Sequence, residues 1–304
     1  MEKIKLMTDS VSDISYANEQ QYNIQVVPIK LAVGGRTLVS RIDFDNEQFY
    51  RMLDEYNEIP STSQITAYEF SEIFEQNYKD GYTDVINVSV NSTGSATYES
   101  SLMAAQEFYE NHPEAVGKFL IHNIDSASYT GCYGFAVVEA AKMIEKGIAA
   151  DDVVAYLKDW CENVTVCFAP YTLKYASKSG RIPSVAAFLG NKLNIKPIMC
   201  LNDREIVTVG KVRGERNIVP EIIKRTVAEM EVGSPYCIVY GNNKLAQKEI
   251  TDLMTEKLGY PPADSYQIGA AIAVNAGPNV IGLISSLGLF IERNNNELKF
   301  DFNL

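Results

Sequence analysis

The sequence predicts an α/β protein of two domains: an N-terminal mostly parallel sheet with helices on both faces, and a C-terminal α+β domain. Length is the first observation, because the chain has 304 residues and domains usually run about 100 to 200. Composition is the second, since 46% hydrophobic and 22% charged residues are typical of globular proteins. The third is the alternation of short apolar runs with amphipathic ones in the first half, which favours strands joined by helices.

The first half contains the expected elements of the parallel sheet. An apolar run at 4–7 predicts the first strand, and the turn Thr8-Asp9-Ser10 separates it from a helix beginning near residue 13. The run 24–33 predicts a second strand, and Gly34-Gly35 predicts a tight hairpin turn into a strand at 37–40. The pattern that follows predicts helices at 46–56, 67–78, 95–111 and 129–146, and strands at 84–90 and 119–124.

The pattern changes after Gly147, and we place the domain boundary between 1–163 and 164–304. A helix at 151–162 precedes a strand at 164–168, and the turn Asn202-Asp203 joins an antiparallel hairpin. The mixed strand order, with helices on one face, indicates an α+β domain. Its expected strands are 164–168, 196–201, 205–209, 236–240, a region near 267–274 and two within 289–304, and its expected helices are 215–230 and 245–258.

Composition excludes several classes of function. A net charge of −12 argues against a general nucleic-acid binder, which needs a surplus of Lys and Arg. The N-terminal residues lead into a strand without an apolar signal core, and no run reaches the roughly 18 apolar residues of a membrane span. The five cysteines and two histidines show no metal-ligand spacing. We therefore expect a cytoplasmic protein with reduced thiols, without metal or cofactor and without stable membrane insertion.

Hydroxyl-rich turns at strand-to-helix junctions are the most informative feature. In an open parallel sheet such junctions meet at one edge, where ligands bind. Helix N-termini offer unpaired N–H donors, and Ser and Thr hydroxyls add donors that suit a carboxylate or a phosphate. The turns are 8–10, 60–64, 91–98 and 125–128.

Helix capping alone explains part of this pattern. We assign Asp9 and Asp125 to capping and turn roles, which stabilise a helix by about 1 kcal/mol each. The stretch 91–97 has more Ser, Thr and Asn than a single cap needs. It therefore predicts ligand binding.

Conventional catalytic apparatus is sparse. His112 lies in a helix-ending turn and His122 lies within a strand, which indicates a surface residue and a structural residue. No GxSxG elbow, phosphate-binding loop or GxGxxG motif occurs. A small serine hydrolase remains an alternative only if one histidine reaches the hydroxyl cluster.

Two basic segments stand out in this acidic chain, at 174–183 and 211–216. Solvated surface charge explains them, but arginine also suits bidentate contact with phosphate or carboxylate, so docking of an acidic partner is a second interpretation. The turn 275–278 follows what we expect to be an apolar strand, and it indicates close approach of the backbone to a ligand or to the other domain.

Taken in order, these segments resemble the DegV family of bacterial proteins over essentially the whole chain. Each match is short, and their order and spacing make the resemblance specific. The matching segments are Thr8-Asp9-Ser10 with Asp13, Val27-Pro28-Ile29, Thr62-Ser63-Gln64, Ser95-Ala96-Thr97-Tyr98, Asp125-Ser126, Ser179-Gly180-Arg181-Ile182, Ile195-Lys196-Pro197-Ile198, Arg213 and Gly277-Pro278.

The resemblance implies a long-chain fatty acid bound in a tunnel between the two domains, with its carboxylate presented to a separate ATP-binding kinase subunit. Such a chain is a lipid-binding protein rather than an enzyme, and the fatty acid is a ligand rather than a cofactor. Thr62 and Ser92 would hold the carboxylate, with Ser63, Ser95 and Thr97 completing the pocket. The further residues it implies are Asn275 and Gly277 in the pocket, and Arg181 and Arg213 for docking of the kinase subunit. The apolar stretches 185–193 and 268–273 are candidates for the tunnel wall, although packing in the core explains them equally well.

The sequence departs from the family pattern at three places. Asn275-Ala276 replaces a His-Thr, Ala96 replaces a Gly, and Ser179 replaces a Gly. Asparagine still donates a hydrogen bond, but it does not become a cation near neutral pH. Asn275 in place of the histidine favours an alternative, an orphan binding protein for another amphipathic carboxylate with no kinase contact.

Overall fold

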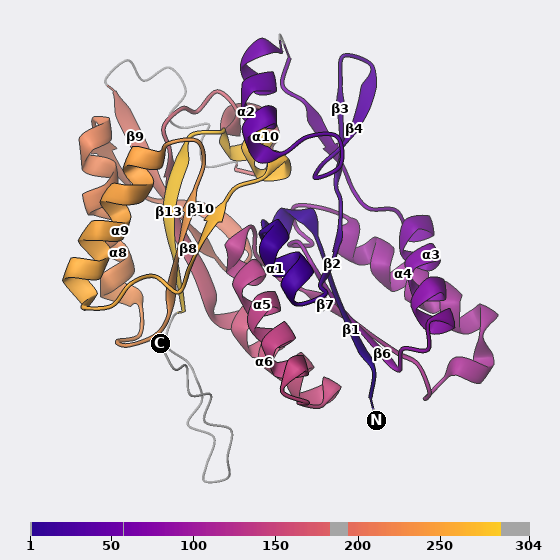
Figure 1. Ribbon diagram of the computed structural model, residues 1–304. Coiled ribbons are helices and arrows are strands. Elements are labelled where there is room, and N and C mark those ends of the chain that lie inside the picture. Colours follow the sequence, from indigo (N-terminus) through magenta and orange to yellow (C-terminus); the bar gives the residue numbers. More distant parts are fainter. Residues whose placement is uncertain (1, 57, 183–193, 287–304) are drawn as a thin grey trace.

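The computed structural model describes residues 2–56, 58–182 and 194–286, and it confirms the predicted fold class (Figure 1). A four-stranded parallel sheet and a six-stranded mixed sheet form two layers, and a small three-stranded sheet stands beside them. Within these residues no helix is long and apolar enough to cross a membrane.

The parallel sheet has the order β2-β1-β6-β7, and every neighbouring pair is parallel. Its strands are β1 (Ile4–Asp9), β2 (Gln25–Val27), β6 (Asp84–Ser89) and β7 (Leu120–Asp125). Helices α3 (Ala67–Lys79) and α4 (Thr97–Asn111) lie on one side of it, and α5 (Gly131–Glu145) and α6 (Ala150–Asn163) lie on the other (Figure 1). Every residue of β6 is buried, as expected for a central strand covered on both faces.

The expected strand at 24–33 divides into two. β2 joins the parallel sheet, whereas β3 (Lys30–Val33) pairs antiparallel with β4 (Arg36–Val39) across the predicted glycine turn and with β5 (Ser61–Ser63). The break falls at Pro28-Ile29, and Pro28 has no N–H to donate to a continuing ladder. Short helices η1 (Ser10–Ser12) and α1 (Tyr16–Gln21) follow β1, α2 (Asn46–Glu55) follows β4, and η2 (Pro113–Ala115) follows α4.

The second sheet has the order β10-β9-β8-β13-β11-β12. All neighbouring pairs are antiparallel except β11 with β12. Its strands are β8 (Val164–Pro170), β9 (Ile195–Asn202), β10 (Glu205–Arg213), β11 (Tyr236–Tyr240), β12 (Asp264–Gln267) and β13 (Val280–Ser286). Helices α8 (Ile218–Glu229) and α9 (Lys244–Leu258) cover one face and pack into a core of their own. The short helices α7 (Ala176–Ser179) and η4 (Glu215–Asn217) follow β8 and β10.

The expected strand near 267–274 is wrong. β12 ends at Gln267, and Ala270–Ala276 forms helix α10. The turn at 275–278 therefore follows a helix, and β13, which the sequence analysis missed, comes after it. The expected strands within 289–304 lie outside the described residues, as do the stretch 185–193 and Pro183.

The two large sheets share one hydrophobic core, because helix α5 packs between them. α5 contacts β1 of the parallel sheet and also β8, β11, β12 and β13. The contact with β12 depends on a glycine, because a β-carbon on Gly131 would collide with the ring of Tyr266. Trp160 of α6 donates a hydrogen bond to the Cys132 carbonyl within this core. The division into 1–163 and 164–304 stays a prediction.

Candidate functional site

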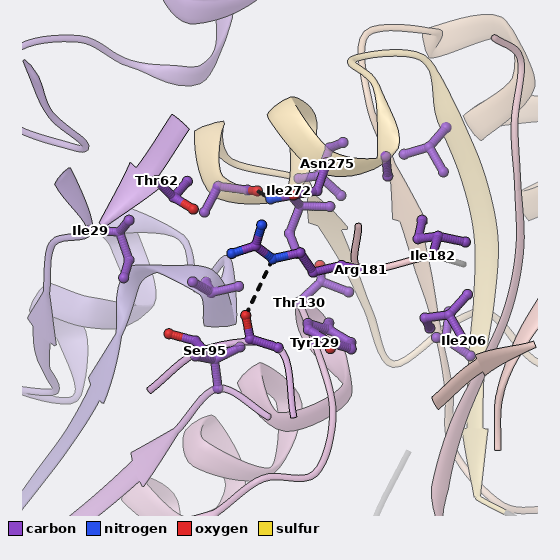
Figure 2. A pocket seen from close by; sticks show the side chains of 18 of the residues that line it. Ile29, Thr62, Ser95, Tyr129, Thr130, Arg181, Ile182, Ile206, Ile272 and Asn275 are labelled. Carbon is purple, nitrogen blue, oxygen red and sulfur yellow. Dashed lines mark hydrogen bonds between the residues drawn. The ribbon is translucent and has the colours of Figure 1, made fainter. Parts of the chain in front are cut away.

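A cavity of about 200 Å³ lies between the carboxyl edge of the parallel sheet and the six-stranded sheet (Figure 2). A buried water needs only roughly 10–15 Å³ of such space, so the cavity accommodates a much larger ligand. Its walls come from both halves of the chain. The lining residues are Val11, Ile29, Thr62, Ser63, Gln64, Val90, Gly94, Ser95, Ala96, Tyr129, Thr130, Val166, Phe168, Arg181, Ile182, Ile206, Val239, Ile268, Ala271, Ile272, Asn275, Ala276 and Val280.

The loops after β1, β6 and β7 meet beside this cavity, as the turn pattern predicted. Asp9, the last residue of β1, connects them. Its carboxylate accepts from the N–H groups of Val11 and Val90 and from the Tyr133 hydroxyl, at 2.9, 2.7 and 2.7 Å. The capping role assigned to Asp9 is present in the bond to Val11, and the same carboxylate also fixes the loop after β6.

Two short segments contribute hydroxyl groups to the polar part of the lining. Thr62 and Ser63 come from β5, and Ser95 comes from the loop before α4. The Ser95 and Thr97 hydroxyl oxygens are 2.9 Å apart, and Thr97 accepts from the Ile65 N–H at 3.3 Å. Thr97 is fully buried. It therefore positions Ser95 and the β5 segment, and it is not among the lining residues.

Ser92 lies outside the cavity lining, in contrast to the expected carboxylate contact. Its N–H donates to Asp125 at 3.1 Å, and its hydroxyl donates to the same carboxylate at 2.5 Å. Arg204, on the turn between β9 and β10, pairs with Asp125 from the other half of the chain. Ser92 thus belongs to the junction between the halves.

Asn275 lines the cavity from α10, where its amide donates to the Ala271 carbonyl at 2.7 Å. The second amide N–H and the amide oxygen are left to face a ligand. Gly277 is buried beyond the lining and has a φ of 99°, which L side chains rarely adopt. Gly277 therefore ends α10 and turns the chain into β13.

The two predicted docking arginines occupy different places. Arg181 is exposed, lines the cavity, and directs its guanidinium toward the region between Thr62, Ser95 and Asn275 (Figure 2). Its Nε lies 3.5 Å from the Gly94 carbonyl. Arg213 is exposed at the end of β10 and does not line the cavity.

The rest of the lining is mainly apolar. Ile206, Phe168 and Val239 contribute from the six-stranded sheet, and Ile268 and Ile272 contribute from the segment of α10. The expected tunnel stretch 268–273 thus borders the cavity at residues 268, 271 and 272. An apolar body with hydroxyl, amide and guanidinium groups at one side suits an amphipathic anion.

A second buried acid lies behind the cavity. Asp13 accepts from the Thr130 hydroxyl at 2.6 Å and from the Gly269 N–H at 2.8 Å. Burial raises the pKa of Asp13 to about 7 and that of Asp9 to about 6, although their hydrogen bonds oppose the rise. Sequence reasoning named Asp13 only within a motif and missed this role, which depends on a residue 256 positions away.

The histidines take no part in the site. His112 pairs with Glu75 and Glu114, and His122 lies 3.1 Å from Asp84. Neither lines the cavity. Among the described residues no group of three or more His, Cys, Asp and Glu side chains is arranged to hold a metal ion.

The chain is similar to known proteins over nearly its whole length. The sequence model of the DegV family, "Uncharacterised protein, DegV family", matches residues 3–287. A DegV domain-containing protein of Caldanaerobacter subterraneus is 30% identical over 289 residues, covering 93% of this chain and 98% of that one.

Solved structures are similar over the same span. A structure from Thermus thermophilus, "Fatty Acid Binding of a DegV family Protein", has a TM-score of 0.81 at 26% identity and covers 94% of this chain and 100% of that one. The Fatty Acid Kinase (Fak) B3 protein of Streptococcus pneumoniae, loaded with linoleic acid, has a TM-score of 0.80 at 18% identity. It covers 94% of this chain and 99% of that one.

Proposed function

This chain belongs to the DegV family, and on that premise we propose that it binds a long-chain fatty acid in the cavity and presents the carboxylate to a separate ATP-binding kinase subunit. The observation that carries the proposal is the division of the cavity into an apolar body and a small polar group to which both halves of the chain contribute. Similar proteins from Thermotoga maritima, Thermus thermophilus and Bacillus subtilis bind fatty acids, which supports this proposal.

The carboxylate is assigned to Thr62 and Ser95. Both line the cavity, whereas Ser92 donates its hydroxyl proton to Asp125. Thr97 orients Ser95 by the 2.9 Å contact of their hydroxyls. Arg181 supplies the positive charge, because its guanidinium lies toward the same group (Figure 2). A hydrogen bond to a charged group contributes about 1.5–3 kcal/mol, so these few contacts fix one end of the ligand.

The acyl chain supplies most of the binding free energy. Each CH₂ group removed from water contributes about 0.8 kcal/mol. The Ile, Val and Phe side chains of the six-stranded sheet offer no hydrogen-bonding groups, which favours hydrocarbon over a polar tail. The carboxylate then lies near the exposed Arg181, where a partner protein can reach it.

The first experiment identifies the ligand and its polar contacts. The purified protein is denatured, released molecules are identified by mass spectrometry, and delipidated protein is titrated with fatty acids of different length. We expect a stoichiometric fatty acid. The double variant Thr62→Ala with Ser95→Ala should weaken binding about 10- to 100-fold, as expected for the loss of hydrogen bonds to a charged group.

Ser92→Ala is the matched control, because it removes a hydroxyl from the same loop but outside the lining. Its affinity should stay within about threefold of the wild type, since an ion-pair junction of this kind contributes about 0–1 kcal/mol. Equal losses in Ser92→Ala and in the double variant would contradict the assignment. No released fatty acid and no reloading would favour the orphan binding protein for another amphipathic carboxylate, which Asn275 in place of the family histidine supports.

A further inference from the structure

Cys167 and Cys200 lie opposite each other on neighbouring strands, on the sheet face away from the cavity. Cys167 is on β8 and Cys200 is on β9, and they are Cα partners in the antiparallel register. Such partners have Cα atoms about 4.5–5.5 Å apart, within the about 4.4–6.8 Å that a disulfide spans. The two thiols are near enough for each to shift the pKa of the other. The geometry therefore permits a disulfide without a large backbone movement.

The two thiols differ in their exposure to solvent and in their pKa. Cys167 is buried, whereas Cys200 is partly exposed. The hydrogen bond from Cys167 lowers the pKa of Cys200, and the Arg225 guanidinium on α8 acts in the same direction. Burial and the nearby Glu229 oppose this effect on the pKa. The accessible thiol is thus the one that forms a thiolate, the reactive form of cysteine.

The other cysteines have no cysteine opposite them on a neighbouring strand, because Cys132 and Cys161 lie on helices and Cys237 pairs with Asp264 and Ile284. Cys132, Cys161 and Cys237 are buried, and burial raises the pKa of each thiol, to about 12 for Cys161. A buried thiol with a raised pKa does not itself attack a peroxide. The same holds for Cys167, so Cys167 acts only in the second step, on the neighbouring sulfur of Cys200. Cys167 and Cys200 therefore stand apart from the other cysteines of this chain.

We propose that Cys167 and Cys200 form a redox site that a hydroperoxide oxidises reversibly to an intramolecular disulfide. The Cys200 thiolate attacks a peroxide oxygen, the O–O bond breaks, and Cys200 becomes a sulfenic acid as the peroxide is reduced. The Cys167 sulfur then attacks the Cys200 sulfur, the S–O bond breaks, and the oxygen leaves as water. With hydrogen peroxide, two thiols and one peroxide give one disulfide and two waters.

The bond has a consequence for the cavity. Cys167 and Cys200 bracket a stretch of chain that carries Arg181 and Ile182, both of which line the cavity. The strand neighbours of Cys167, Val166 and Phe168, also line it. Oxidation would close this stretch into a covalent loop while leaving its cavity residues in place. The site itself does not depend on which ligand the cavity holds.

The test uses the full-length reduced protein and hydrogen peroxide. Free thiols are alkylated before and after reduction, and peptides are analysed by mass spectrometry. We expect the loss of two thiols per chain, a linked pair of peptides containing Cys167 and Cys200, a mass decrease of about 2 Da per chain because two hydrogens are lost, and full recovery with a thiol reductant. A chain that stays monomeric on a non-reducing gel confirms that the bond is intramolecular.

Variants distinguish oxidation of a cysteine pair from oxidation of a single exposed thiol. Cys200→Ser should abolish peroxide consumption, whereas Cys167→Ser should leave Cys200 to oxidise to the sulfinic acid without a disulfide. Cys161→Ser is the control and should oxidise like the wild type. Arg225→Ala should shift the pH profile of Cys200 alkylation to higher pH, which a merely structural arginine would not do. Sulfinic acid on wild-type Cys200 with Cys167 still reduced, or a disulfide between chains, would overturn the proposal.

Discussion

Asp13 links three parts of the molecule through one carboxylate. It follows η1, accepts from Thr130 at the start of α5, and accepts from Gly269 at the start of α10. Thr130 and several residues of α10 line the cavity, so this carboxylate fixes two of its walls. The charged and titratable groups around it are Arg41, Asp9, Tyr50 and Tyr133.

Replacing Asp13 with Asn should remove a pH dependence of stability. Burial raises the folded pKa of Asp13 from 3.8 to about 7, so the folded protein holds this proton more tightly than the unfolded chain. Its stabilising contribution is complete below about pH 4 and is lost as the pH rises through about 7. Since one pKa unit corresponds to about 1.4 kcal/mol, the difference in unfolding free energy between wild type and Asp13→Asn should fall by about 2–4 kcal/mol from about pH 4 to about pH 8.

Urea unfolding at several pH values measures this difference. Asn keeps an oxygen for the Gly269 N–H and offers an amide to Thr130, so the local geometry is retained. Asp54→Asn, at an exposed position of α2, is the control and should give a pH-independent difference. A pH-independent difference for Asp13→Asn would show that Asp13 has an ordinary pKa.

At the scale of elements, the β9–β10 hairpin reaches from the second sheet to the loops of the first. The Asn91 amide and the Thr93 hydroxyl donate to the Arg204 carbonyl at 2.7 and 3.3 Å. The Arg204 side chain pairs with Asp125, at the end of β7. Ile206, two residues farther along, lines the cavity together with Ser95 (Figure 2). The turn therefore holds two walls of the cavity together.

Loss of the Arg204 side chain should speed ligand release. Arg204 has a φ of 69°, so Arg204→Gly removes the side chain without straining the turn. A half-exposed ion pair contributes about 0–1 kcal/mol, which predicts a roughly two- to fivefold faster dissociation of a fluorescent fatty acid in stopped flow.

Salt provides an independent check on the same ion pair. Raising the ionic strength should speed release of the fatty acid from the wild type and from Arg204→Lys, because salt screens the ion pair with Asp125. Release from Arg204→Gly should not change, because this variant has no such ion pair. Lys248→Ala removes an ion pair that lies within α9, so this control should keep the salt response of the wild type. Equal salt sensitivity with and without the charge at position 204 would mean that the pair with Asp125 does not hold the hairpin.

At the scale of the whole molecule, periodicity predicted most elements because each had one clear pattern. The amphipathic helices at 46–55 and 67–79 and the apolar strand at 84–89 were recognisable for this reason. Ala270–Ala276 was misassigned because it borders the cavity on one side and the core on the other. Because apolar residues are needed on both sides, the segment lacks the alternation of apolar and polar residues that is typical of a helix. A short apolar run of this kind fits a strand and a helix equally well.

The candidate site was predictable in its chemistry but not in its detail. The hydroxyl-rich loops do meet beside the cavity, because the carboxyl ends of parallel strands share one edge. Ser92 and Ser95 look equivalent in sequence, and only tertiary contact with Asp125 separates their roles. No sequence pattern pointed to Arg204, because its role depends on the ion pair with Asp125, which lies 79 positions away in the chain.

The charge of the whole molecule bears on how a kinase subunit would dock. The net charge of −12 repels an acidic partner protein over most of the surface. Exposed arginines near the cavity would therefore mark the place where such a partner can approach. Arg213 is exposed and does not line the cavity, so a docking role of Arg213 can be tested without disturbing ligand binding. Arg213→Ala should leave fatty acid affinity within about twofold and slow acyl phosphate formation by the kinase subunit about five- to tenfold, with a weaker salt dependence. Lys248→Ala, on the exposed face of α9, is again the matched control and should change neither quantity. Unchanged acyl phosphate formation in Arg213→Ala would remove Arg213 from the docking surface and leave Arg181, which lines the cavity, as the remaining predicted docking arginine.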